Sequence, residues 1–227
     1  MKERKLEIYI LRHGTTEWNR VYRIQGRTDT ALDPLGEEMA RYTGEYFRRE
    51  GISFDRVFSS PLERARKTAG FVAGEEMILD QRLCELSFGR LEGKTINDMK
   101  AEGIPFYLFA EDPAEYDRFA AGEPSMETLT GLCARTAEFM VEMVEKNTEL
   151  KDTDRILISA HGACNNGLLM HIRGEKDLTR FWENGLQPNC GVDVVNYDRA
   201  KGEYRILEEN RFFYPAELKG NTGNLIM

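Results

Sequence analysis

The sequence has no apolar run near the ~18 residues that a membrane-spanning helix needs. Its charged start, residues 1–5, is followed by no apolar signal segment or cleavage site. The four cysteines are Cys84, Cys133, Cys164 and Cys190. None belongs to a C-x-x-C pair, so we expect free thiols in a reducing compartment, with no zinc site and no disulfide framework. These absences predict a cytoplasmic protein that makes no membrane contact.

An excess of positive charge is also lacking. The 227 residues contain 31 Lys and Arg against 39 Asp and Glu, a net charge of −8. This balance argues against nucleic-acid binding, because proteins that bind the phosphate backbone carry a basic face. A small phosphorylated partner is still allowed, since one pocket can be basic in an acidic protein. The length suits a single domain over residues 1–227, with an insertion at about 94–124 and a C-terminal arm at about 211–227.

Apolar runs alternate with amphipathic stretches along the chain. Strands are predicted at residues 6–11, 57–59, 77–79 and 156–158, followed by a hairpin at residues 192–207. Helix starts are predicted at Asp33-Pro34, at the capping-box pattern Ser60-Pro61-Leu62-Glu63, and at Ser125. This order predicts an α/β fold, a three-layer α/β/α sandwich whose mostly parallel sheet ends in an antiparallel edge hairpin.

Three of the predicted strands end in groups suited to binding an oxyanion. Arg12-His13 follows the first strand, Arg64 the second and His161-Gly162 the fourth. The carboxyl ends of parallel strands meet at one sheet edge, so we expect these groups to converge there. From the residues alone, His13 can be a nucleophile, an acid–base group or a metal ligand. Metal ligation is disfavoured, because no carboxylate or second histidine has ligand spacing to it.

A phosphoryl group accounts for this set of side chains. A neutral imidazole can attack phosphorus, and arginines stabilise the charge on its oxygens. The leaving oxygen then needs a proton, which a carboxylic acid in apolar surroundings can supply. Glu85, among Leu83, Leu86 and Phe88, is the best candidate, and Glu92 is its nearest competitor.

Four segments, in this order, resemble the motifs of the histidine phosphatase superfamily, also called the phosphoglycerate mutase-like family. They are Arg12-His13-Gly14 with Asn19 and Gln25-Gly26; residues 59–69, which include Arg64; residues 83–93, which include Glu85; and His161-Gly162. The resemblance implies a phosphoglycerate mutase-like fold, no metal and no cofactor, with His13 as phosphohistidine nucleophile and Glu85 as proton donor. It implies that Arg12, Asn19, Gln25, Gly26, Arg64, His161 and Gly162 hold the substrate phosphate.

The superfamily contains phosphatases and mutases. Mutases carry Glu-Arg-His-Tyr-Gly where this chain has Glu85-Leu86-Ser87-Phe88-Gly89, and a lysine where it has Ile96. They also carry paired arginines in the insertion, where residues 104–124 hold only Arg118. The step at residues 122–125, Gly-Glu-Pro-Ser, resembles the Gly-Glu-Ser step of the phosphatase branch. These differences favour transfer of the phosphoryl group to water over its transfer back to the substrate.

We therefore predict a metal-independent phosphatase of the histidine acid phosphatase type. Its partner would be a small phosphorylated metabolite, and the aromatic insertion favours a substrate with a neutral or apolar body. Two alternatives remain open: a cofactor-dependent phosphoglycerate mutase-type phosphotransferase, and a catalytically weak phosphate-binding or interaction protein on the same fold. A monomer and a homodimer are both compatible with the sequence. Residues 104–124 and the C-terminal arm are both candidates for a lid.

Overall fold

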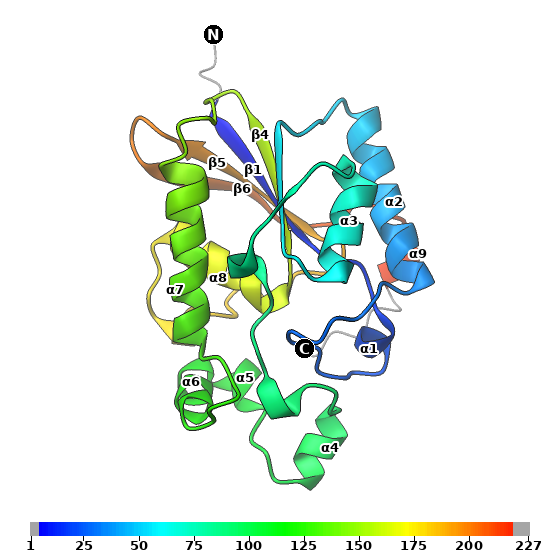
Figure 1. The fold of residues 1–227 in the computed structure, drawn as a ribbon, viewed down its shortest axis with the longest axis vertical. Coiled ribbons are helices and arrows are strands. Elements are labelled where there is room, and N and C mark those ends of the chain that lie inside the picture. Colours follow the sequence, from blue (N-terminus) through cyan, green and yellow to red (C-terminus); the bar gives the residue numbers. More distant parts are fainter. Residues whose placement is uncertain (1–4, 220–227) are drawn as a thin grey trace.

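A six-stranded sheet forms the centre of the molecule in the computed structural model, which describes residues 5–219 (Figure 1). Its order is β3-β2-β4-β1-β5-β6. The strands are β1 (Leu6–Arg12), β2 (Arg56–Ser59), β3 (Ile78–Leu79), β4 (Arg155–Ala160), β5 (Val192–Asp198) and β6 (Glu203–Arg211). The first four pair in parallel, whereas β5 is antiparallel to both β1 and β6. The predicted sheet and its antiparallel edge hairpin are confirmed.

Helices cover both faces of this sheet. The α-helices of residues 5–219 are α1 (Glu17–Arg20), α2 (Pro34–Arg49), α3 (Glu63–Ala73), α4 (Ile96–Ala101), α5 (Leu108–Glu111), α6 (Pro113–Ala121), α7 (Leu129–Phe139), α8 (Gly162–Arg173) and α9 (Ala216–Lys219). In Figure 1, α2 and α3 lie on one face, and α7 and α8 lie on the other. The three-layer prediction is therefore confirmed. Between residues 5 and 219, no helix is both long and apolar enough to cross a membrane.

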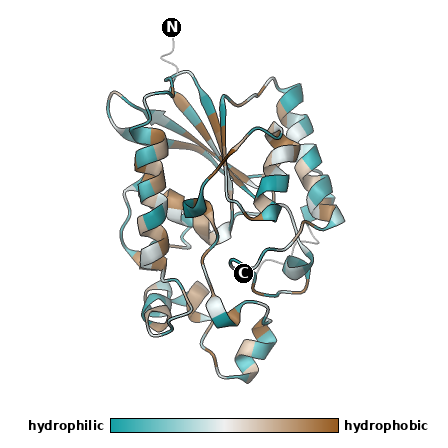
Figure 2. Cartoon of the chain, in the orientation of Figure 1, coloured by the Kyte–Doolittle hydropathy of each residue, from teal (hydrophilic) through white to brown (hydrophobic). Residues whose placement is uncertain are grey.

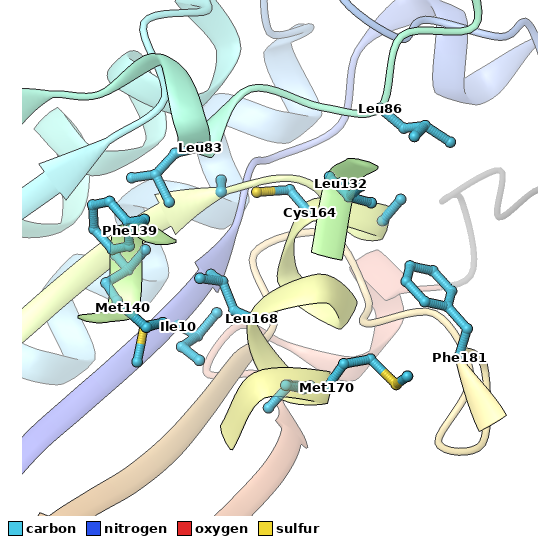
Figure 3. Packing of buried hydrophobic residues seen from close by; sticks show 14 of the residues in the cluster. Ile10, Leu83, Leu86, Leu132, Phe139, Met140, Cys164, Leu168, Met170 and Phe181 are labelled. Carbon is cyan, nitrogen blue, oxygen red and sulfur yellow. The ribbon is translucent and has the colours of Figure 1, made fainter. Parts of the chain in front are cut away.

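Alternation along β1 divides the core between the two layers of helices. Ile8 and Ile10 belong to the cluster under α7 and α8, where Phe139 and Leu168 also pack (Figure 3). Tyr9 and Leu11 face α2 and α3 instead. Figure 2 shows hydrophobic and hydrophilic bands on these helices, as expected for helices with one buried face. Burial on both sides holds β1 rigidly, and with it the residues that follow its end.

The first predicted helix start is confirmed and the second is wrong. Asp33 caps α2 by accepting the Gly36 N–H at 2.7 Å, with Pro34 in the first turn. The helix after β2 begins at Glu63, and no side chain caps it. The Ser60 hydroxyl instead accepts the Leu62 N–H at 3.3 Å and lies 2.8 Å from a nitrogen of His161. The Ser60 hydroxyl thus contacts His161, which follows the distant strand β4, and does not cap the helix as the local pattern predicted.

The predicted cap at Ser125 is also wrong. Thr128 caps α7 by accepting the Gly131 N–H at 3.0 Å. The Ser125 hydroxyl accepts the Arg90 N–H at 3.3 Å, and Glu123 pairs with the Arg90 side chain. The segment before α7 is therefore tied to the chain around residue 90, and the helix starts later than the pattern suggested.

The first part of the C-terminal arm is packed rather than loosely held. Tyr214 is buried, and its hydroxyl donates to the Asn189 carbonyl at 2.9 Å. Phe213 stacks on Tyr46 of α2 with ring centroids 4.3 Å apart. Aromatic burial thus anchors residues 212–214, which local polarity did not reveal. Residues 220–227, the remainder of the predicted arm, lie outside the described residues, as do residues 1–4.

The insertion lies beyond the carboxyl ends of the central strands, at the end of the molecule opposite the start of β1 (Figure 1). Phe106, Phe109 and Tyr116 are buried and continuous with the main core. Phe109 also meets Trp182 edge-to-face, with ring centroids 5.1 Å apart. The insertion is therefore packed against the sheet edge where the predicted site residues gather.

One buried carboxyl makes stability depend on pH. Asp193 in β5 accepts the Asn210 N–H at 2.6 Å through one oxygen, and its other oxygen has no partner among the described residues. Burial raises its pKa from 3.8 to about 6, so between these values only the folded state keeps the proton. We expect the free energy of unfolding to fall by on the order of 2–3 kcal/mol from pH 4 to 6 through this group, and no further above. Urea unfolding of Asp193→Asn should not show this fall in the free energy of unfolding between pH 4 and 6. If the pH dependence is unchanged in the variant, Asp193 is not its cause.

Candidate active site

The ends of β1 and β4 bring the two predicted site histidines together. These strands pair in parallel with Arg12 opposite Ala160, and the His13 N–H donates to the Ala160 carbonyl at 3.1 Å. His13 thus immediately follows β1, and His161 immediately follows β4, the neighbouring strand of the sheet. Their ring centroids lie 5.1 Å apart. Sheet register alone explains why residues so distant in sequence share one site.

His13 has one ring nitrogen available for chemistry. Its Nδ1 lies 2.6 Å from the Gly14 carbonyl oxygen, which can only accept, so Nδ1 carries the hydrogen. Nε2 therefore carries the lone pair of the neutral ring. Burial lowers the pKa of His13 well below its ordinary value, and the charges of Arg64 and Arg12 lower it further. A buried neutral imidazole with a free Nε2 is suited to nucleophilic attack.

Arg64, in the first turn of α3, is 1% exposed. Its two Nη groups donate to the Thr28 and Gly26 carbonyls at 2.9 and 2.7 Å. Its buried Nε has no partner among the described residues. Burial lowers its pKa to about 10, which keeps the guanidinium charged near neutral pH. Arg64 therefore brings a fixed charge into the site and holds the loop that carries Gly26.

Arg12 is oriented by a residue that the sequence did not single out. Its Nη1 donates to the carbonyl of Gln187. The Gln187 side chain donates to the Ile10 carbonyl at 3.0 Å and accepts from Asn165 of α8 at 2.7 Å. Burial lowers the pKa of Arg12 to about 10, so this guanidinium also stays charged.

His161 has one ring nitrogen paired and one unpaired among the described residues. Its Nε2 lies 2.8 Å from the Ser60 hydroxyl, and Nδ1 has no partner among residues 5–219. Ser60 already accepts the Leu62 N–H, so its own hydrogen can go to Nε2. This leaves the proton of the neutral ring on Nδ1 as a donor. Burial and then Arg64 lower the pKa of His161 well below its ordinary value.

Two predicted amide side chains have their oxygens occupied. Asn19 Oδ1 accepts the Thr16 N–H at 3.2 Å, and Gln25 Oε1 accepts the Thr30 hydroxyl at 2.7 Å. Their NH₂ groups remain as donors at the wall of the pocket. Gly26 has φ +57°, and a Cβ there would lie 2.2 Å from a Glu92 oxygen. A side chain at residue 26 would therefore disturb this wall.

Glu85 and Glu92 occupy different environments. Glu85 lines the pocket, and its carboxyl accepts N–H groups from Leu86, Ala163 and Cys164 at 2.9–3.2 Å. Glu92 accepts the Arg27, Thr28 and Phe88 N–H groups outside the pocket lining. Glu92 thus braces loops, and Glu85 is the carboxyl that faces the site.

The apolar surroundings predicted for Glu85 are only partly present. Leu83 and Leu86 are completely buried in the core and do not line the pocket, whereas Phe88 does. The carboxyl meets backbone N–H groups at the start of α8 instead. The sequence could not show which side chains of the irregular segment around Glu85 line the pocket.

Six of the seven residues predicted to bind phosphate line one pocket together with His13 and Glu85. The seventh, His161, is absent from this lining, and its ring centroid lies 5.1 Å from that of His13. The rest of the wall is apolar: Ile24, Phe88, Phe106, Phe109, Ala163, Trp182 and Leu186. The sequence analysis did not identify Trp182 or Leu186. A Cβ on Gly162 would lie 2.5 Å from Leu186 Cδ1, so glycine lets this wall approach α8 closely. The pocket wall therefore combines a polar, basic part with an apolar part.

Comparison with known proteins identifies the family. Residues 8–210 match the protein-family model described as "Histidine phosphatase superfamily (branch 1)". The chain belongs to the histidine phosphatase superfamily. It is 34% identical over 199 residues to a protein of Erwinia tasmaniensis named "Probable phosphoglycerate mutase GpmB", covering 86% of each chain. The resemblance predicted from four short motifs is confirmed.

Solved structures support the fold of this histidine phosphatase superfamily member. Bacillus stearothermophilus YhfR aligns with a TM-score of 0.77 and 25% identity, covering 90% of this chain and 96% of that one. A mycobacterial glucosyl-3-phosphoglycerate phosphatase aligns with a TM-score of 0.76 and 24% identity, over 90% and 98% of the two chains. Family and neighbours together support an enzyme of the phosphatase or mutase kind.

Proposed function

We propose that the protein is a metal-independent phosphatase that hydrolyses a small phosphomonoester through a phosphohistidine at His13. The observation that carries the proposal is the buried, neutral His13, whose Nδ1 is held by the Gly14 carbonyl. Arg12 and Arg64 line the same pocket and can donate to phosphate oxygens, and we assign the same role to the Nδ1–H of the neighbouring His161. Such donors stabilise the charge of phosphoryl transfer without a metal.

The proposed reaction has two steps. First, His13 Nε2 forms a bond to phosphorus, the bond from phosphorus to the leaving oxygen breaks, and Glu85 protonates that oxygen. Second, water attacks the phosphohistidine, Glu85 accepts its proton, and phosphate leaves as His13 is restored.

The apolar part of the pocket wall supports hydrolysis rather than phosphoglycerate isomerisation. Among the residues that line the pocket, the basic side chains are Arg12, His13 and Arg64, all at the phosphate end. Arg118 is 68% exposed and pairs with Glu115 on the surface of α6. A second anionic group on the substrate would thus meet aromatic rings instead of cations. A neutral or apolar leaving group agrees better with this wall.

One experiment separates the proposal from its alternatives. The native protein is incubated in EDTA with phenyl phosphate, and separately with 3-phosphoglycerate plus its 2,3-bisphosphate, and phosphorus NMR follows the products. We expect inorganic phosphate from phenyl phosphate and little isomerisation. Efficient isomerisation without phosphate release would establish the mutase alternative. Absence of hydrolysis of any phosphomonoester would favour a phosphate-binding protein.

We also propose a cytoplasmic location, which the four free cysteines support, and a monomer or homodimer. Fractionation of cells and light scattering of the purified protein test these two points.

A further inference from the structure

The backbone carbonyl of Glu85 receives two guanidinium groups. Arg135, on the sheet-facing helix α7, donates through Nη2 at 3.1 Å, and Arg27 donates through Nε at 3.3 Å. The other arm of Arg135 donates to the Arg82 carbonyl at 2.5 Å. One planar side chain therefore spans two carbonyls of the segment that carries the proposed proton donor.

Glu127 completes this arrangement from the start of α7. Its carboxylate accepts Arg135 Nε at 2.7 Å and Nη2 at 3.0 Å, a two-pronged ion pair. It also accepts the Ser87 N–H at 3.2 Å and pairs with Arg27 at 3.2 Å. The segment is thus held by contacts to residues 82, 85 and 87, on both sides of the Glu85 side chain.

This ion pair is shielded from solvent. The side chains of Arg135 and Glu127 are 14% and 17% exposed. Burial alone would raise the pKa of Glu127, but Arg135, Arg27 and the Ser87 N–H together lower it. Both partners are therefore charged near neutral pH, and the contact is stronger than an exposed pair.

The Glu85 segment needs such support because it has little regular structure of its own. Residues 84–88 belong to no helix or strand, so neither intrahelical nor ladder hydrogen bonds set the path of their backbone. The carboxyl itself contacts backbone N–H groups of α8 from across the site. Its distance from a leaving oxygen thus depends on where the backbone carbonyl is held, and a displacement of about 1 Å can cost on the order of 10²-fold in rate.

We propose that Arg135, locked by Glu127, is a positioning residue for proton transfer by Glu85. This inference rests on the proposed phosphatase function. Arg135 is absent from the pocket lining, and its hydrogen bond to the backbone carbonyl of Glu85 connects it to the site. A pair that merely stabilised the fold would lower all activities alike. A pair that positions the acid lowers them according to how much the leaving oxygen needs a proton.

The test compares substrates of different leaving-group acidity. Nitrophenolate leaves without protonation, whereas the alkoxide of benzyl phosphate does not. We expect Arg135→Gln to reduce kcat/KM for benzyl phosphate by about 10²-fold and for 4-nitrophenyl phosphate by less than about 5-fold. Glu85→Gln should show the same pattern with a larger loss. The parameter kcat/KM is used because it reports the steps up to departure of the leaving group.

A double substitution decides whether Arg135 acts through Glu85. In the Glu85→Gln background, adding Arg135→Gln should leave kcat/KM for benzyl phosphate within about 2-fold, because the residue being positioned is already inactive. Arg118→Gln, an exposed arginine in another ion pair, is the matched control and should change neither substrate. Thermal melting of each variant verifies that it is folded.

Two further variants test the proposal if Arg135→Gln fails to fold. Arg135→Lys keeps the charge beside Glu127 but cannot span both carbonyls, and Glu127→Gln keeps Arg135 but loosens it. Both should reproduce the selective loss on benzyl phosphate. Equal losses on the two substrates, or losses that multiply with Glu85→Gln, would overturn the proposal. Failure of the proposed function would look different, since the native protein would then hydrolyse neither ester.

Discussion

Replacing His13 by alanine is expected to reduce hydrolysis of phenyl phosphate by on the order of 10⁴-fold or more, because no serine, threonine, cysteine or second histidine is among the described residues that line the pocket. The same substitution should abolish a covalent phosphoenzyme. Initial rates measure the first effect, and phosphorus NMR of protein trapped with excess substrate measures the second. A phosphorus–nitrogen bond is stable in alkali and lost in acid, which distinguishes phosphohistidine from a phosphoserine or an adventitious ester.

The third histidine provides the control for this experiment. His171 lies on α8 outside the pocket lining, with Nε2 2.7 Å from Glu145. His171→Gln should keep both hydrolysis and the covalent label. Undiminished hydrolysis by His13→Ala would refute the phosphohistidine mechanism. Loss of activity in both variants would indicate a defect in folding rather than in chemistry.

Replacing Arg64 by methionine is expected to lower kcat/KM by about 10²–10³-fold, the loss typical of one donor to a transition-state oxyanion. It should also destabilise the fold by about 1–3 kcal/mol, since the Thr28 and Gly26 carbonyls lose their donor. A third effect concerns His13. Burial lowers the pKa of His13 most and Arg64 lowers it next, so removing Arg64 raises that pKa.

The pH dependence of kcat/KM separates the effect of the Arg64 charge from the effect of the shape of its side chain. The acidic limb of kcat/KM reports protonation of His13 in the free enzyme, so in Arg64→Met it should move to higher pH. Arg64→Lys keeps the charge and should leave the limb in place, although one ammonium cannot bridge both carbonyls. An NMR titration of the His13 ring checks the shift directly. A limb that stays in place in Arg64→Met would show that Arg64 does not control His13.

Much of the architecture was predictable because its signals are local. The strand at residues 6–11 and the hairpin after residue 192 are apolar runs bounded by polar residues, and both were found. The cap and proline of α2 also act within one turn. The site residues Arg12, Arg64 and His161 each come within a few residues of the end of a predicted strand, so the topology of a parallel sheet was enough to expect their convergence.

The errors occur where a distant contact overrides a local pattern. The Ser60 hydroxyl serves His161 and the Ser125 hydroxyl serves Arg90, and neither partner lies within the segment that suggested a helix cap. Gln187, which orients Arg12, comes from a loop near the end of the chain and has no motif. The arm around Tyr214 was expected to be loose because its anchoring partners are contributed by α2 and the loop at Asn189.

The sequence by itself determined the family, the strands, and the residues that end them, since each depends on the order of residues along a few adjacent positions. Only the tertiary structure decided which nitrogen of His13 is free, which of Glu85 and Glu92 faces the site, and that Glu127 and Arg135 hold the Glu85 backbone. These outcomes depend on hydrogen bonds between segments far apart in the chain. Their partners are chosen by register and packing, which no local pattern encodes.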